Sequence, residues 1–166
     1  MSKLSIMRAT VEVVDKIVAL FDAYRQFYGK ATDLQRARNF LTERLSKKES
    51  VVFLASEDGG PVGFAQLYPS FSSLSMQQTW ILNDLFVSPN ARSYGVGAAL
   101  MERSKRLALE TNVRELSLET AKTNLAAQSL YEKYGWKRDE MFYKYELSVR
   151  SRFRFDAAIR TAKPRQ

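Results

Sequence analysis

The sequence predicts a single α/β domain built around a mixed β-sheet. Its 166 residues are the length of one ordinary domain. Runs of β-branched and aromatic residues, of strand length, are interleaved with amphipathic runs of helical length. Strands that alternate with helices are typical of domains in which helices cover the faces of a sheet. We therefore expect one domain over residues 1–149, followed by a C-terminal extension, residues 150–166, of different composition.

The chain begins with a predicted strand and two predicted helices. Residues 4–9 have the length of a short edge strand. Apolar residues recur at helical spacing between residues 11 and 28, and Gly29 is placed to end that helix. Thr32 or Asp33 can cap a second helix, in which the apolar residues lie one to two turns apart.

A hairpin follows, and it leads into another strand. Residues 51–56 form a continuous apolar run, which is the pattern of a strand covered on both faces. A Glu-Asp-Gly-Gly turn joins this run to a returning strand over residues 62–68. The uncharged polar stretch 69–79 is predicted as a loop. Residues 80–87 are predicted as the next strand, which a Ser-Pro-Asn sequence ends.

The second half of the chain alternates helices and strands. A helix is predicted from residue 94 or 95 to residue 110, and an alternating strand follows over residues 115–120. A further helix covers residues 124–134 and stops at Gly135. Residues 141–147 alternate again, which predicts a final strand.

The composition excludes several kinds of active site. The chain contains no cysteine and no histidine. Disulfide bonds, thiolate nucleophiles and cysteine-ligated metals are therefore excluded. Ser-His-Asp triads, histidine metal sites and imidazole acid–base chemistry are excluded as well. Catalysis would have to use carboxylates, tyrosine, lysine, serine, threonine or backbone groups, and no metal is expected.

Charge and hydropathy bear on location and partners. No apolar run exceeds five residues, whereas a membrane helix needs roughly 20, and the first residues lack the features of a signal peptide. We expect a cytoplasmic protein without a membrane partner. The net charge is +8, of which residues 150–166 carry +5. We expect this basic extension to be solvated or to contact a second copy in a homodimer. Phe153 and Phe155 between its arginines leave nucleic-acid binding as the less favoured alternative.

The most specific local feature is a glycine-containing turn between the strand 80–87 and the next helix. It carries Arg92, Gly95 and Gly97 in the pattern Arg-x-x-Gly-x-Gly. Because glycine has no side chain, the backbone can come close to a ligand there. The free N–H groups of the first helical turn and the helix dipole then favour an anion, and we predict a pyrophosphate site. A Rossmann fingerprint would need a third glycine, and a P-loop would need Gly-Lys-Ser/Thr.

A second motif lies in the helix over residues 124–134. It reads Asn-x-x-Ala-x-x-Leu-Tyr-x-x-Tyr-Gly-Trp and alone is typical of an amphipathic helix. Together with the glycine turn, it makes residues 4–147 resemble the GNAT superfamily of acetyl-coenzyme-A-dependent N-acetyltransferases. The residues that carry the resemblance are Val87, Pro89, Arg92, Gly95, Val96, Gly97 and Leu100 in the first motif, and Asn124, Ala127, Leu130, Tyr131, Gly135 and Trp136 in the second. Ser93 departs from the glycine usual in the family, and Trp136 departs from phenylalanine.

The resemblance implies a twisted sheet with splayed central strands, flanked by about four helices, and acetyl-CoA as co-substrate between those strands. The pantetheine arm would pair with the backbone of Leu85, Phe86 and Val87 like an added strand. Asn124 would bind near that arm. The diphosphate would rest on the amides of the turn, which comprises Arg92, Ser93, Tyr94, Gly95, Val96, Gly97 and Ala98.

The resemblance also implies a reaction without an enzyme nucleophile. A neutral amine attacks the thioester directly in a ternary complex, and the backbone N–H of Leu85 or Phe86 would stabilise the oxyanion. Tyr131 matches the tyrosine proposed to protonate the leaving thiolate. Diamine acetyltransferases, a neighbouring branch, tend to have Glu-Asp where this chain has Asn83 and Asp84. Either Asp84 acts as a base through water, or the amine loses its proton to solvent.

The acceptor amine is left open by the sequence. The candidate substrate-binding residues are Tyr24, Tyr28, Tyr68 and Asn83, with Phe27 beside them. Aromatic rings can hold an alkylammonium group by cation–π contact, although such rings could equally belong to the core. A small amine, an amino-acid derivative or a protein amine would fit. The alternative functions are a coenzyme-A-binding regulator without catalysis and a nucleic-acid-binding module that uses the basic extension.

Overall fold

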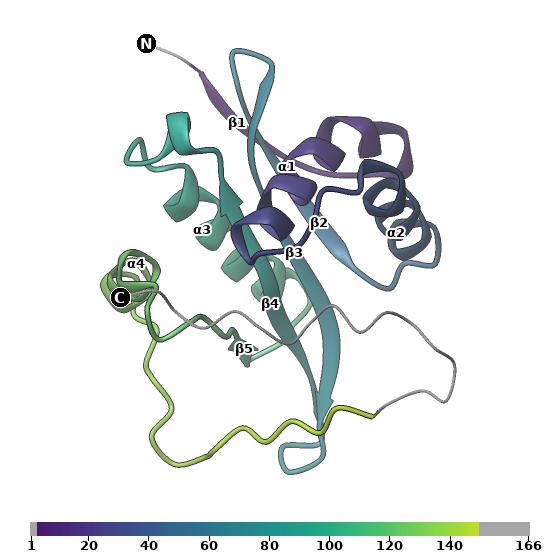
Figure 1. The fold of residues 1–166 in the computed structure, drawn as a ribbon. Helices are drawn as coiled ribbons and strands as arrows, with labels where there is room; N and C mark the ends of the chain where they lie inside the picture. Colours follow the sequence, from purple (N-terminus) through teal and green to yellow (C-terminus); the bar gives the residue numbers. More distant parts are fainter. Residues whose placement is uncertain (1–2, 150–166) are drawn as a thin grey trace.

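Five strands lie in chain order in one sheet in a computed structural model that describes residues 3–149 (Figure 1). The strands are β1 (Leu4–Arg8), β2 (Val51–Glu57), β3 (Gly60–Ser72), β4 (Gln77–Val87) and β5 (Leu116–Ser117). The first four are antiparallel to their neighbours, and β5 runs parallel to β4. The predicted α/β domain with a mixed sheet is confirmed.

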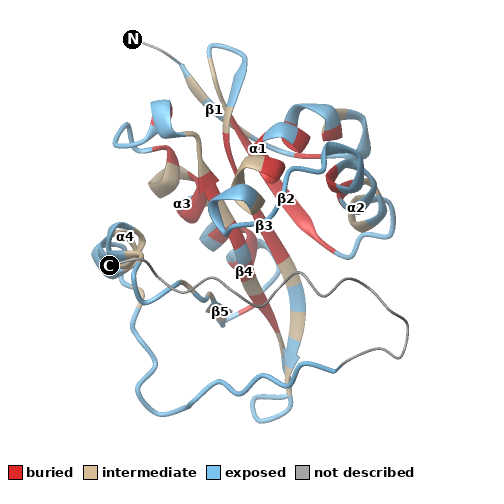
Figure 2. Cartoon of the chain, viewed as in Figure 1, coloured by how far each residue is buried: buried red, intermediate tan, exposed pale blue. Residues whose placement is uncertain are grey.

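Helices cover both faces of this sheet, and the sheet separates two apolar clusters of the core. The helices are α1 (Val14–Phe27), α2 (Leu34–Ser46), α3 (Val96–Glu110) and α4 (Leu125–Lys133), with the short 3-10 turns η1 (Val11–Val13) and η2 (Pro89–Ala91). The first two helices share a cluster on one face, and α3 belongs to the cluster on the other, against which α4 packs Leu130 and Tyr131. Buried residues are concentrated on the strands and on the helix faces turned toward them (Figure 2).

Short polar signals set the ends of the helices. The Asp33 side chain accepts a hydrogen bond from the Arg36 amide at 3.0 Å, so Asp33 and not Thr32 caps α2. Gly29 follows α1 with a φ of +75°, a left-handed conformation that glycine adopts without strain. The Asn124 side chain accepts from the Ala127 amide and caps α4.

A β-bulge in β4 changes which face of the sheet its side chains meet. Gln66 of β3 pairs with Asp84, but the next residue, Leu67, pairs with Leu82, so Asn83 is an extra residue on β4. Leu82 packs in the core on the α3 side, whereas Phe86, four residues later, packs in the core on the α1 side. In an unbroken strand residues 82 and 86 would share a face.

The β3–β4 connection is shorter than predicted. The stretch 69–79 was predicted as a loop, but β3 continues to Ser72 and β4 starts at Gln77. Met76, in the tight turn between them, has a φ of +50°. The sequence pattern misses this part of the hairpin because strand pairing here is made by the backbone, while its side chains are largely polar and exposed.

The C-terminal part of the domain has less strand than predicted. Only Leu116–Ser117 of the expected strand 115–120 pairs with β4. The predicted strand 141–147 is wrong, since these residues form no strand and their side chains are exposed, Tyr145 by 89%. Alternation alone does not supply a partner, and β5 is too short to offer one. Lys144 of this segment instead forms ion pairs with Glu119 and Glu146.

Two further observations bear on the expectations for location and partners. Within residues 3–149, no helix is both long and apolar enough to cross a membrane. The predictions for the basic extension, residues 150–166, lie outside the described residues.

The connection between α1 and α2 is organised around one buried carboxylate. Asp22 is 2% exposed. Its oxygens accept hydrogen bonds from Thr32 Oγ1 at 2.6 Å, from the Asp33 amide at 2.9 Å and from Gln26 Nε2 at 2.9 Å, and Arg25 lies 3.1 Å away. Burial alone would raise the pKa of Asp22, but these hydrogen bonds and the Arg25 charge outweigh burial and lower that pKa.

We predict that Asp22→Asn lowers the free energy of unfolding by roughly 2–3 kcal/mol, because hydrogen bonds to a charged group are lost and the new NH₂ faces donors. The measurement is urea unfolding at neutral pH. Since the folded-state pKa is the lower one, the contribution of Asp22 is present above the unfolded-state pKa and is lost as pH falls through the folded-state pKa. The difference between wild type and mutant should therefore shrink in acid.

The matched control is Asp15→Asn on the same helix. Asp15 is 69% exposed and pairs with Arg38 at the surface, so its loss should cost less than about 1 kcal/mol. Equal losses for the two variants would show that Asp22 does not organise the connection.

Candidate functional site

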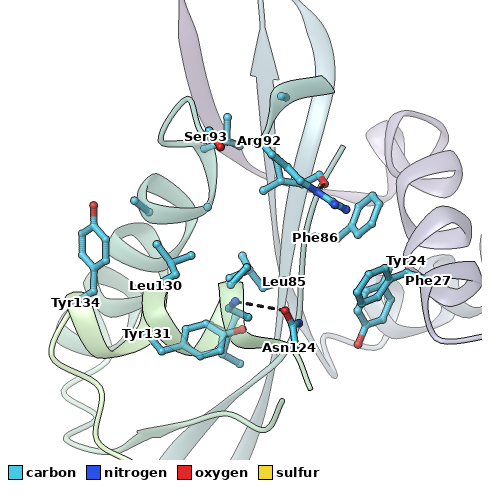
Figure 3. Close-up of a pocket in the computed structure, with 18 of the residues that line it drawn as sticks. Tyr24, Phe27, Leu85, Phe86, Arg92, Ser93, Asn124, Leu130, Tyr131 and Tyr134 are labelled. Atoms are coloured by element: carbon cyan, nitrogen blue, oxygen red, sulfur yellow. Dashed lines mark hydrogen bonds between the residues drawn. The ribbon is translucent and has the colours of Figure 1, made fainter. Parts of the chain in front are cut away.

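A cleft opens where β4 and β5 part. The ladder between these strands contains only the pairs Trp80–Leu116 and Ile81–Ser117. The half of β4 after Ile81 therefore has no β5 neighbour, and the expected splaying of the central strands is present. The resulting cleft, of about 580 Å³, is lined by this half of β4, the turn before α3, α4 and the end of α1 (Figure 3). Sites at the carboxyl ends of separating strands are common ligand sites.

The turn before α3 presents backbone to the cleft. Gly95 caps α3 with a φ of +84°, and Ser93 has a φ of +68°. Ser93 thus takes the left-handed conformation that the glycine usual at this position would adopt freely. A side chain on Gly97 would place its Cβ 3.2 Å from Leu130 of α4, so glycine here lets α3 and α4 approach. The first amides of α3 have no partners within the helix and lie at the cleft.

Arg92 is held at the same end of the cleft. Its Nε donates a hydrogen bond to the Val87 carbonyl at 3.1 Å, and its guanidinium lies 5.9 Å from the centre of the Phe86 ring. Free amides, the start of a helix and a fixed cation therefore converge, and all three favour a bound anion.

Tyr131 stands on the α4 side of the cleft. Its ring lies 6.2 Å from that of Trp136, and α4 is fixed at its start by the Asn124 cap. Burial raises the pKa of the Tyr131 hydroxyl, and Tyr28 raises it further. Tyr131 is therefore protonated at neutral pH and can donate a proton or a hydrogen bond in the cleft.

Tyr24 stands on the α1 side, opposite Tyr131 (Figure 3). Its ring lies 5.9 Å from Phe64 and 6.3 Å from Phe86, which fixes it over β3 and β4. Burial raises the pKa of Tyr24, and the neighbouring Asp84, to which its hydroxyl hydrogen-bonds, raises it further.

Asp84 lies next to Tyr24 but does not itself line the cleft. It is 5% exposed and is not among the residues that line the cleft. Asn83 Nδ2 donates to its Oδ1 at 3.0 Å, and Tyr24 also donates to it. Burial raises the pKa of Asp84, although these two hydrogen bonds partly offset that effect.

The structure brings together nearly all of the residues predicted for the site. All the predicted residues line the cleft except Asp84, Tyr68 and Tyr94. Tyr94 is 75% exposed. The Tyr68 hydroxyl accepts from Gln66 Nε2 at 3.0 Å, and burial, with Asp84 nearby, raises its pKa to about 12.

Sequence reasoning missed two charged lining residues. Glu119 follows the end of β5, and Lys133 lies in the last turn of α4. Neither belongs to a motif. Glu119 could have been found from its position just after a strand parallel to β4, because open sheets form ligand clefts at the carboxyl ends of such strands. Among residues 3–149, no cluster of acidic side chains has the grouping of a metal site.

The chain is similar to known acetyltransferases in sequence. The model of the acetyltransferase (GNAT) family matches residues 17–136. An uncharacterized N-acetyltransferase, YhfO of Bacillus subtilis, is 44% identical over 146 residues, which cover 88% of this chain and 98% of that protein. A probable acetyltransferase of Haemophilus influenzae is 35% identical over 137 residues, which cover 82% and 92%.

Solved structures share the fold. The crystal structure of a probable acetyltransferase has a TM-score of 0.83 and 41% identity, and the match covers 89% of this chain and 99% of that one. An aminoglycoside N-acetyltransferase solved in complex with CoA has a TM-score of 0.75 and 20% identity, covering 90% and 97%. At that identity the second likeness concerns the fold alone.

Proposed function

The chain belongs to the acetyltransferase (GNAT) family, whose general reaction moves an acetyl group from acetyl-CoA to an amine, and from this premise we propose its site and mechanism. The proposal is that a primary amine attacks acetyl-CoA directly in a ternary complex in the cleft beside β4. The observation that carries it is the meeting, in one cleft, of an anion-binding turn and the half-buried Tyr131.

The anion-binding turn would hold the diphosphate of the co-substrate. The free amides from Gly95 to Ala98 and the Arg92 guanidinium supply donors and positive charge there. Leu85 to Val87, the part of β4 that has no β5 neighbour, offer backbone groups to the pantetheine arm, and Asn124 would bind near that arm. A solved family member with CoA bound supports acetyl-CoA as the co-substrate.

Tyr131 would act as the general acid. Attack of the amine nitrogen forms a C–N bond, and the carbonyl oxygen gains negative charge that a β4 amide, of Leu85 or Phe86, stabilises. When the C–S bond breaks, Tyr131 gives its proton to the sulfur. A proton released from the nitrogen restores Tyr131, so the step balances. Positioned acids contribute roughly 10²–10⁴-fold.

Asp84 would act as the base that accepts the first proton of the incoming ammonium. Burial raises its pKa, which makes the carboxylate a stronger proton acceptor.

The acceptor end of the cleft favours a small amine with one positive charge. Tyr24, Phe27 and Tyr28 form an aromatic wall, with Phe27 and Tyr28 rings 5.1 Å apart, and such rings attract an alkylammonium. In the described chain Glu119 is the carboxylate that lines the cleft, and it pairs with Lys144. A polyamine would require more carboxylates than these residues supply.

Two expectations remain predictions. The homodimer was inferred from the basic extension, which lies outside the described residues, and the cytoplasmic location follows only from the sequence. The same extension is the basis for the nucleic-acid alternative. Its removal should abolish any salt-dependent nucleic-acid binding.

The reaction is tested by thiol release from acetyl-CoA with five acceptors: phenethylamine, D-phenylalanine, spermidine, kanamycin and a peptide with a free N-terminus. We expect turnover with at least one of them, and faster turnover of phenethylamine than of spermidine. Tight binding of acetyl-CoA without acetylation of any amine would favour the regulator without catalysis.

We predict that Gly97→Glu abolishes binding of coenzyme A in a folded protein. The carboxylate would occupy the amide-lined turn and repel the diphosphate. Binding is measured by calorimetry and folding by circular dichroism. The control is Gly97→Ala, whose Cβ would lie 3.2 Å from the flexible end of Leu130 and 3.8 Å from Val87. This variant should retain binding. Unchanged affinity of the glutamate variant would place the site elsewhere.

We predict that Tyr131→Phe lowers kcat by about tenfold or more, with little change in the acetyl-CoA KM, because a transition-state interaction is lost while the ring is kept. The melting temperature is measured alongside kcat. A normal kcat in a stable variant would demote Tyr131 to a packing residue. A loss of stability proportionate to the loss of activity would also favour packing.

A further inference from the structure

We propose that Tyr24 passes the proton of the acceptor ammonium to Asp84, so that a carboxylate outside the cleft acts as the base through a tyrosine that lines it. This inference rests on the proposed acetyltransferase function. It replaces a water molecule, or the solvent, with a named residue of α1 as the route for the proton.

The bulge in β4 creates the need for such an intermediary. The extra residue, Asn83, shifts Asp84 onto the α1 face of the sheet, where Phe86 also packs. Asp84 is 5% exposed there and does not line the cleft. An amine in the cleft therefore does not reach this carboxylate directly.

Tyr24 connects the cleft with the buried Asp84 carboxylate. Its ring lines the cleft and is fixed against Phe64 and Phe86, and its hydroxyl hydrogen-bonds to Asp84. Across the cleft stands Tyr131, the residue proposed to protonate the thiolate (Figure 3). The acid and the relay thus come from α4 and α1, on opposite sides of the reacting groups.

The proton transfer balances. An N–H bond of the ammonium breaks as a bond forms to the Tyr24 oxygen, while the Tyr24 proton moves to an Asp84 oxygen. One positive and one negative charge are neutralised, which leaves a neutral amine, a neutral tyrosine and a carboxylic acid. After the product leaves, the carboxylic acid returns its proton to solvent by the same route.

Gln66 supplies an acceptor for the protonated state. It lies directly across the ladder from Asp84 and is fully buried. Its Nε2 donates to Ser50 and Tyr68, whereas its Oε1 is a buried oxygen without a hydrogen-bond partner in the described chain. A carboxylic acid at Asp84 gains an O–H donor, and Gln66, its partner across the ladder, has a buried oxygen that could accept it. Buried polar atoms without partners are uncommon and call for such an explanation.

The groups around Asp84 favour a switch between its two forms. Tyr24 on α1, Tyr68 on β3 and Tyr131 on α4 all have a raised pKa, so their hydroxyls are neutral at neutral pH. Arg44 and Glu49 act on Tyr68 with opposite effects on its pKa. Burial raises the pKa of Asp84 itself, and Tyr24 and Asn83 oppose that rise. Within the part of the chain that the structure describes, the carboxylate is therefore stabilised by hydrogen bonds and not by a paired cation.

The first test compares kcat as a function of pH for wild type, Tyr24→Phe, Asp84→Asn and the double variant, with whichever of the five acceptors is turned over fastest. The kcat of each single variant should fall by about tenfold or more, and the kcat of the double variant should fall no further than that of the worse single variant. The acid limb of the wild-type profile should vanish in Asp84→Asn. Additive losses, or a Tyr24→Phe variant with wild-type kcat, would overturn the relay.

The control for the chemical change is Tyr145→Phe, which removes a hydroxyl from a residue that is 89% exposed and does not line the cleft. It should keep the wild-type kcat and pH profile. A comparable loss there would show that the Tyr24 result is not specific to the cleft.

The second test needs no acceptor amine. The Asp84 carboxyl carbon is titrated by NMR in wild type and in Tyr24→Phe. Removing the hydroxyl removes a hydrogen bond that favours the carboxylate, so the Asp84 pKa should rise in the variant. An unchanged pKa would contradict the relay. A wild type that binds acetyl-CoA but acetylates none of the five acceptors would contradict the proposed function instead.

Discussion

The extra residue in β4 is the constraint on which the rest of the site depends. Asn83 interrupts the regular alternation of the strand, just beyond the point where the β4–β5 ladder ends at Ile81. Before this point β4 is an ordinary inner strand. After it, backbone groups of Leu85 to Val87 face a cleft, and Asp84 faces α1. The inserted residue therefore turns Asp84 to the buried α1 face, next to the point where the strand edge opens.

The cleft has two chemically different ends. At the α3 end, amides at a helix start and the Arg92 guanidinium favour a polyanion. At the α1 end, tyrosine and phenylalanine rings line the cleft. Among residues 3–149 the carboxylate that lines it is Glu119, which pairs with Lys144. This division matches a reaction that joins a large anionic co-substrate to a small cationic amine, and it explains how a chain without histidine, cysteine or a metal cluster in its described part can carry out the reaction.

The sequence predicted the α3 end of the cleft better than the α1 end. Gly95 and Gly97 act through the backbone, as turn and close contact, and the Asn124 side chain caps a helix. Such roles leave motifs. The position of Asp84 behind Tyr24 depends on a bulge, and no residue pattern predicts that bulge. The strand predicted over residues 141–147 was wrong because alternation describes a side-chain pattern and not the presence of a partner strand.

The most direct test of this account is a crystal structure of the protein with acetyl-CoA. The account predicts that the diphosphate lies on the amides between Gly95 and Ala98, that the pantetheine follows Leu85 to Val87, and that the sulfur lies within hydrogen-bond reach of the Tyr131 hydroxyl. Acetyl-CoA bound on another surface, or bound in the cleft with its sulfur away from Tyr131, would contradict it.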